Sequence, residues 1–235
     1  MSGTLYLVPN LLGAVPPANV LPARTIDVAR SLVHWAVETP KAARAFIKTL
    51  DPPQPIATLA IRELGNEPSA QHLAALLAPL RDGADVGLLS DAGCPGVADP
   101  GAALVAAAHD ARLRVVPLVG PSAILLALMA SGMNGQSFAF HGYLPVKSDA
   151  RADALRRLES DSRARRQAQL FIETPYRNEA MLGAIAEVLQ PGTLVCIAAD
   201  LTLPSETIER CTAREWKKRD HARFAKRPAL FVLQA

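Results

Sequence analysis

The sequence has few aromatic residues, three cysteines and no long hydrophobic run. Cys94, Cys196 and Cys211 are odd in number and far apart, without a CxxC pair, so neither a disulfide framework nor a zinc site is indicated. The longest apolar run, residues 123–130, is far shorter than a membrane span. The first ten residues lack the basic and apolar segments of a signal peptide. We therefore expect a cytoplasmic protein without a bound metal.

Two phosphate-binding signatures are also absent. The chain contains no GxGxxG and no GxxxxGK[ST] motif, so it carries neither a dinucleotide-binding fingerprint nor a P-loop. Positive charge is missing from one segment, because no lysine or arginine lies between Arg81 and Arg112. With 235 residues, the chain is long enough for one large or two modest domains.

The most informative segment runs from Val86 to His109. Its apolar start, residues 86–89, predicts a buried parallel strand, and a loop rich in glycine and proline follows. Asp99 and Pro100 then predict the N-cap and first position of a helix. Ligands bind at the carboxyl ends of strands in open α/β sheets. This acidic, cation-free loop therefore suits a cationic or neutral ligand with hydroxyl groups. The alternative is an ordinary loop whose acids only cap the helix.

The rest of the chain predicts an α/β fold in two parts. The first part alternates strands at 4–8, 32–37, 56–64, 86–89 and 114–118 with helices at 23–32, 41–50, 69–80 and 102–108. Such alternation is typical of a parallel sheet. A helix at 123–131 is followed by strands at 137–143, 170–172, 193–199, 206–210 and 229–233, with helices at 147–166, up to Leu189 and at 213–223. We place the boundary at Val119–Gly120, which gives a parallel domain 1–119 and a mixed-sheet domain 120–235.

Seven fragments in order resemble one family: GTLYLVP, LLSDAGCPGVADPG, VVPLVGPSA, FHGYLP, FIETPYR, AADLTLPSETI and RPALFV. Together they are similar to the tetrapyrrole (corrin/porphyrin) methylase family of S-adenosylmethionine-dependent methyltransferases. The branch that they resemble most contains the small-subunit rRNA cytidine 2′-O-methyltransferases. The resemblance implies a parallel-sheet N-terminal half, a mixed-sheet C-terminal half, a cofactor cleft between them, and a homodimer.

The resemblance also implies a set of residues that contact S-adenosylmethionine. They are Pro9, Asp91, Ala92, Gly93, Cys94, Val97, Ala98, Ser122, Ala123, Phe171, Ala199, Pro228, Ala229 and Leu230.

Three positions depart from the relatives. Cys94 stands where many tetrapyrrole-modifying relatives have an aspartate, and we interpret it as a small loop residue facing the cofactor rather than a nucleophile. VPNLLG replaces an ATPIGN-like first loop, and residues 38–41 read Glu-Thr-Pro-Lys rather than Glu-Asp-Thr-Arg.

Methyl transfer to oxygen needs a positioned nucleophile and a route for its proton. Asp91 and Glu38 are the catalytic candidates, although cofactor binding or loop capping is the favoured interpretation of Asp91, and Glu38 equally suits a structural role. The substrate candidates are Glu38, Tyr143, Lys147, Tyr176 and Arg177, and the last two also suit a helix start. The five histidines show no ligand spacing.

Two basic segments bear on the substrate. Residues 209–227 carry eight lysines and arginines against three acids, and residues 147–166 carry seven against four. Either these segments face RNA, with Trp216 and Phe224 as the nearby aromatics, or they are solvated helices. The sequence favours a methyltransferase that acts on an rRNA ribose 2′-hydroxyl. The alternatives are a methyltransferase acting on a tetrapyrrole or another small molecule, and a non-catalytic cofactor-binding relative.

Overall fold

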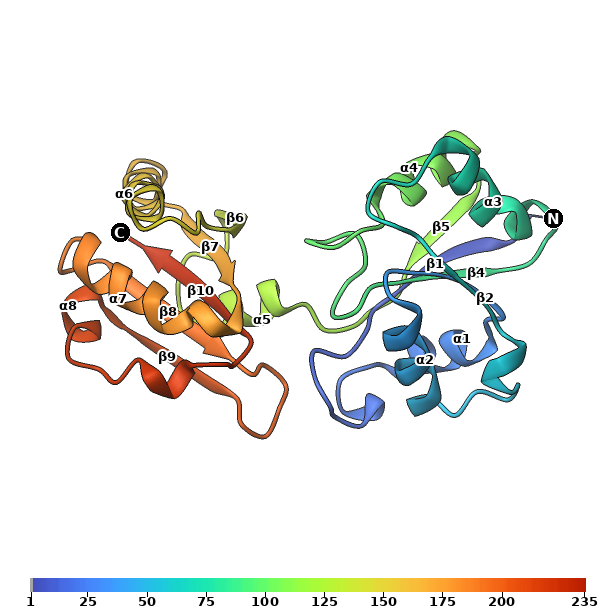
Figure 1. The fold of residues 1–235 in the computed structure, drawn as a ribbon, viewed down its shortest axis with the longest axis horizontal. Coiled ribbons are helices and arrows are strands. Elements are labelled where there is room, and N and C mark those ends of the chain that lie inside the picture. The colour runs from blue at the N-terminus through green and yellow to red at the C-terminus, as the bar shows by residue number, and fades with distance from the viewer. Residues whose placement is uncertain (1) are drawn as a thin grey trace. The chain divides into compact units, whose positions relative to one another are not determined.

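The computed structural model describes residues 2–235, and the chain forms two compact units, one up to Ser122 and one from Ala123 (Figure 1). The boundary expected at Val119–Gly120 lies a few residues earlier. None of the helices in residues 2–235 has the length and hydrophobicity needed to span a membrane.

The first unit contains one five-stranded parallel sheet in the order β3-β2-β4-β1-β5. The strands are β1 (Thr4–Val8), β2 (His34–Val37), β3 (Ala60–Glu63), β4 (Val86–Leu89) and β5 (Arg114–Pro117). The helices between them are α1 (Ala23–Ser31), α2 (Pro40–Thr49), α3 (Ala70–Arg81) and α4 (Ala102–Asp110). The alternation of strands and helices predicted from the sequence is confirmed.

Both faces of this sheet are buried. Trp35, Val37 and Leu89 pack with residues of α1 and α2, whereas Val86 and Leu88 pack with residues of α3 and α4. Figure 1 shows the two helix pairs on opposite sides of the sheet. Burial on both faces explains why β4 is a continuous apolar run.

The second unit contains a mixed sheet in the order β6-β7-β10-β8-β9. Its strands are β6 (Phe138–Tyr143), β7 (Ala168–Glu173), β8 (Leu194–Ala199), β9 (Thr207–Thr212) and β10 (Ala229–Gln234). β6 and β7 are parallel, and the central β10 is antiparallel to β7 and β8. The helices are α5 (Ala123–Ser131), α6 (Ser148–Arg165), α7 (Asn178–Val188) and α8 (Ala213–Trp216). This parallel and mixed pair of sheets confirms the predicted fold class.

One face of the second sheet carries the core of this unit. Side chains of α6, α7 and α8 cover it, and Phe171 stacks on Phe231 with the ring centroids 5.2 Å apart. α5 packs against β8, β9 and β10 outside this cluster.

Two expectations about helices were wrong. α4 begins after Gly101, whose φ of 142° suits glycine, and Asp99 therefore lies in the loop and not at the N-cap. The basic helix expected over 213–223 is the single turn α8, followed by a short 3-10 turn at Ala222–Phe224. Within this segment the buried residues are Ala213, Trp216 and Phe224. They are too few and too widely spaced to form the apolar stripe that would hold a longer helix against the core.

Candidate functional site

The carboxyl edge of the first sheet gathers the loops that follow β1, β2, β4 and β5. Because all five strands are parallel, their carboxyl ends lie at the same edge. The loop after β4, residues 90–101, contains the acidic, cation-free sequence. This edge therefore contains the N-terminal part of the predicted site.

Asn10, immediately after Pro9, joins two of these loops. Its side chain is nearly buried, and its Nδ2 donates hydrogen bonds to the backbone oxygens of Ser90 at 2.9 Å and Asp91 at 3.0 Å. Its backbone N–H donates to the oxygen of Gly93 at 2.8 Å, and its Oδ1 accepts from the N–H of Leu11 at 2.8 Å. Asn10 therefore fixes the start of the loop after β4. Sequence reasoning chose Pro9 and missed its neighbour.

Asp91 and Glu38, the two catalytic candidates, are brought together. The backbone N–H of Asp91 donates to Oε2 of Glu38 at 3.0 Å. The hydroxyl of Thr39 donates to Oδ2 of Asp91 at 2.7 Å, and Thr39 makes no side-chain bond to the first turn of α2. The side chain of Thr39, which follows β2, thus orients the exposed carboxylate of Asp91, which follows β4.

Two glycines sit at close approaches along this edge. A Cβ on Gly101 would lie 3.2 Å from the backbone nitrogen of Gly96, and a Cβ on Gly120 would lie 2.3 Å from the side-chain Cγ of Pro9. Ala98 has a φ of 64°, a conformation that costs energy for a residue with a side chain. The loops are therefore closely packed at both glycines, with little room for larger residues.

Asp99 is a third carboxyl at this edge that sequence reasoning did not place in the site. The pKa of Asp99 is raised to about 6, first by burial and then by the charges of Glu38 and Asp91, while the hydrogen bond with the Ser90 side chain lowers it. The Asp-Pro pair suggested a helix cap, which hid this role. The signal in the sequence was instead the lack of any cation nearby.

Cys94 lies inside the same group of loops. Its Sγ is 3.5 Å from the backbone oxygen of Pro121, which links the loop after β4 to the loop after β5. Burial raises the pKa of the Cys94 thiol, and the charge of Asp99 raises it further. A thiol kept protonated is a poor nucleophile, which agrees with a packing role.

The remaining predicted residues of the first unit lie around this centre. Ala92, Val97 and Ala98 are exposed, Gly93 is buried, and Ser122 ends the unit half-buried.

In the second unit, the carboxyl ends of β6 and β7 carry the predicted substrate residues other than Glu38. Tyr143 ends β6, and Lys147 follows it before α6. Tyr176 and Arg177 follow β7 in the 3-10 turn Pro175–Arg177. Glu173, the last residue of β7, accepts a hydrogen bond from Nε of Arg177 at 2.9 Å. Glu173 was not predicted from the sequence.

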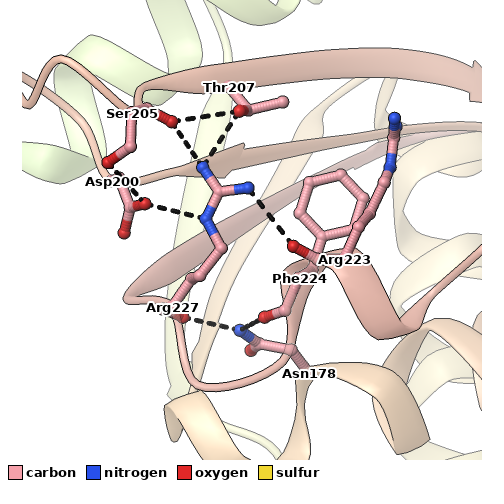
Figure 2. Close-up of polar contacts among 7 residues, drawn as sticks. All are labelled: Asn178, Asp200, Ser205, Thr207, Arg223, Phe224 and Arg227. Carbon is pink, nitrogen blue, oxygen red and sulfur yellow. Dashed lines mark hydrogen bonds and ion pairs between the residues drawn. The ribbon is translucent and has the colours of Figure 1, made fainter.

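A polar network holds the neighbouring loops of this unit (Figure 2). Nε of Arg227 donates to Oδ2 of Asp200 at 2.7 Å, and Nη2 donates to the hydroxyl of Thr207 at 2.9 Å. The amide of Asn178 donates to the backbone oxygens of Phe224 and Arg227 at 3.0 and 2.7 Å. The backbone before β10 is therefore fixed on both sides.

The predicted cofactor residues of the second unit have different surroundings. Phe171, Ala199 and Leu230 have buried side chains, Ala123 and Ala229 are half-buried, and Pro228 is exposed. Ala229 pairs with both Ala199 and Glu173, so Pro228 and Ala229 lie at the same edge as Arg177.

Comparison with known proteins decides the family. The sequence model of the Tetrapyrrole (Corrin/Porphyrin) Methylases matches residues 23–217. The chain belongs to the tetrapyrrole methylase family. As a member, it is a methyltransferase.

Named relatives and solved structures agree with this tetrapyrrole methylase assignment. The chain is 32% identical to the ribosomal RNA small subunit methyltransferase I of Escherichia coli O157:H7 over 94% of its length and 74% of the relative's. It is 35% identical to the protein of the same name from Vibrio cholerae serotype O1, over 87% of its length and 67% of the relative's. The crystal structure of a diphthine synthase shares the fold, with a TM-score of 0.69 and 13% identity over 100% of this chain and 90% of that one.

Proposed function

We propose that this chain transfers the methyl group of S-adenosylmethionine to a ribose 2′-hydroxyl of small-subunit ribosomal RNA. The names of the E. coli and V. cholerae relatives support the RNA class. The observation that carries the proposal is the cluster of Glu38, Asp91 and Asp99 at the carboxyl edge of the first sheet. Asp91 and Asp99 belong to a segment without lysine or arginine, residues 82–111.

The chemistry of this edge fits the cofactor. S-adenosylmethionine supplies, when bound, an electrophilic methyl group on a positively charged sulfur. Carboxylates and backbone oxygens attract that cation and accept hydrogen bonds from ribose hydroxyls, whereas lysine would repel the sulfonium. The predicted cofactor contacts of the first unit are at Pro9, along residues 91–98 and at Ser122. Those of the second unit are at Ala123, Phe171, Ala199 and residues 228–230.

Proximity supplies most of the catalysis in this proposal. Attack by the ribose oxygen forms a carbon–oxygen bond as the carbon–sulfur bond breaks, and the hydroxyl proton passes to a carboxylate or to water. A base works best when its pKa lies near the working pH, and the pKa of Asp99, raised to about 6, suits Asp99 to this exchange. Asp91 and Glu38 then orient the ligand. The homodimer, the cleft between the halves and the cytoplasmic location remain predictions.

Cofactor binding is tested by thermal unfolding with S-adenosylhomocysteine. Ligand binding to the folded state raises the melting temperature by mass action, so millimolar ligand is expected to stabilise the parent protein. Asp91→Ala removes the carboxylate that Thr39 holds, and it is expected to abolish the shift.

Asp82→Ala is the matched control, because Asp82 is an exposed aspartate at the C-terminal end of α3, at the opposite edge of the sheet. It is expected to keep the full shift. A parent protein whose melting curve does not respond to the ligand contradicts the cofactor assignment.

A further inference from the structure

Two exposed tyrosines lie at neighbouring strand ends in the second unit. The side chains of Tyr143 and Tyr176 are 61% and 81% exposed, although the chain has only three tyrosines. Because β6 and β7 are parallel neighbours, with Tyr143 beside Ile172, the two side chains follow the same edge of the sheet. Exposed aromatic rings stack on unpaired bases, at about 1–3 kcal/mol per base.

A basic residue follows each tyrosine at this edge. Lys147 is exposed before α6, and Arg177 is adjacent to Tyr176. Arg177 donates through Nε and Nη2 to Oε1 of Glu173, and through Nε to the hydroxyl of Thr174 at 3.2 Å. Within residues 2–235 its Nη1 forms no hydrogen bond, and the side chain is 26% exposed, so the Nη1 edge of the guanidinium is free to donate to a ligand.

Glu173 explains how Arg177 is held. Its side chain is fully buried, and its Oε2 has no hydrogen-bond partner within residues 2–235. A buried carboxylate is costly without a charged partner, so Glu173 binds the guanidinium tightly. The turn itself is anchored, because the N–H of Lys226 donates to the oxygen of Pro175 and that of Arg177 to the oxygen of Thr174, both at 2.9 Å. The side chains of Tyr176 and Arg177 therefore project from a rigid turn.

The aromatic residues of the basic segment are less available for RNA than the two tyrosines. Trp216 and Phe224, the aromatics of the basic segment, are fully buried, and Nε1 of Trp216 donates to the oxygen of Val195. Arg219 and Arg223 are paired with Glu209, and Arg227 with Asp200, as Arg177 is with Glu173. The edge at Tyr176 differs from the basic segment because it places an exposed ring next to its guanidinium.

We propose that the carboxyl ends of β6 and β7 form a subsite for single-stranded RNA. Tyr176 stacks on a base, Arg177 contacts a phosphate, and Glu173 is the positioning residue that orients Arg177. Tyr143 and Lys147 extend the subsite along the same edge. This inference rests on the proposed function, since it gives the binding contacts for its RNA substrate.

The test measures binding of a fluorescein-labelled, mixed-sequence single-stranded RNA by anisotropy over a range of salt concentrations. Tyr176→Ala is expected to weaken binding about 5- to 150-fold, and Tyr176→Phe, which keeps the ring, to bind like the parent. Arg177→Ala is expected to lower the slope of log affinity against log salt by about 0.7, the value of one phosphate contact on a single strand. Arg81→Ala, an exposed arginine at the end of α3, is the charge control and is expected to keep the parental slope.

Glu173→Gln tests positioning with a kinetic measurement. With small ribosomal subunits as substrate, it is expected to raise KM for RNA several-fold while kcat and the affinity for S-adenosylhomocysteine stay parental. A folding defect would instead lower kcat and cofactor affinity together.

The outcomes separate the two proposals. Absence of methyl transfer by the folded parent overturns the proposed function, whereas the anisotropy experiment still tests the subsite. Parental affinity and salt slope in both Tyr176→Ala and Arg177→Ala overturn the subsite, as does a parent protein that does not bind single-stranded RNA.

Discussion

Replacement of Asn10 by aspartate tests how the loop after β4 is held. The two side chains have nearly the same shape, but a carboxylate cannot donate the two hydrogen bonds that Nδ2 gives to Ser90 and Asp91. Each buried backbone oxygen left without its donor costs about 1–3 kcal/mol, a figure that includes the lost bond. Because two oxygens lose their donor, we expect Asn10→Asp to lower the free energy of unfolding by about 2–6 kcal/mol at pH 8, and to weaken S-adenosylhomocysteine binding.

The pH dependence of the same variant separates lost hydrogen bonds from added charge. Burial against two backbone oxygens raises the pKa of the introduced carboxyl above its unfolded value of about 3.9. Ionisation of the introduced carboxyl therefore lowers the stability of the folded state as the pH rises from the unfolded pKa through the folded pKa. This loss of stability is absent below the unfolded pKa. Asn10→Ala lacks these bonds at every pH, so its penalty is expected to stay constant.

Urea unfolding at pH 8 and pH 5, with calorimetric titration of the ligand, measures both effects. The reasoning is refuted if Asn10→Asp unfolds like the parent at pH 8 and binds the ligand equally well. It is also refuted if its penalty is the same at pH 5 and pH 8.

Two further predictions concern the same edge. Asp99 has a raised pKa of about 6, so its ionisation destabilises the folded state as the pH rises from about 4 through 6. Asp99→Asn is expected to raise stability at pH 8 by on the order of 1 kcal/mol, after discounting for solvent screening, but not at pH 4. Ionised Asp99 also attracts the sulfonium. In the parent, the affinity for S-adenosylmethionine relative to that for S-adenosylhomocysteine should therefore increase as the pH rises through 6. If Asp99→Asn keeps this increase, Asp99 does not contact the sulfonium. Gly120→Ala places a Cβ 2.3 Å from Cγ of Pro9 and is expected to lower the melting temperature by several degrees. Gly135→Ala, whose Cβ would meet nothing within 4 Å, is the control and is expected to change the melting temperature little. Equal melting temperatures of the two variants would exclude the close packing at Gly120.

Local sequence patterns were sufficient for most of the fold. The apolar run of β4 predicted a strand buried on both faces, and the alternation with helices predicted the parallel sheet. Asp91 and Glu38 could be placed together because the carboxyl ends of parallel strands lie at one edge.

Long-range contacts explain what the sequence did not predict. Asn10 bonds to residues about 80 positions away, and no local pattern encodes such a pairing. Asp99 followed by proline has the form of a helix cap, but the glycine two residues later takes the conformation at which α4 begins. Trp216 and Phe224 were considered as stacking residues because they lie among basic residues, and the structure instead buries both.

Transfer of a tritiated methyl group from S-adenosylmethionine tests the central claim most directly. Purified protein is incubated with small ribosomal subunits and with a small-molecule extract, both from cells that lack it, and the labelled rRNA is digested to nucleosides. The account predicts label in a 2′-O-methylated nucleoside of small-subunit rRNA, and loss of that label in Asp91→Ala but not in Asp82→Ala. Label found only in the small-molecule extract, or in neither fraction, would contradict it.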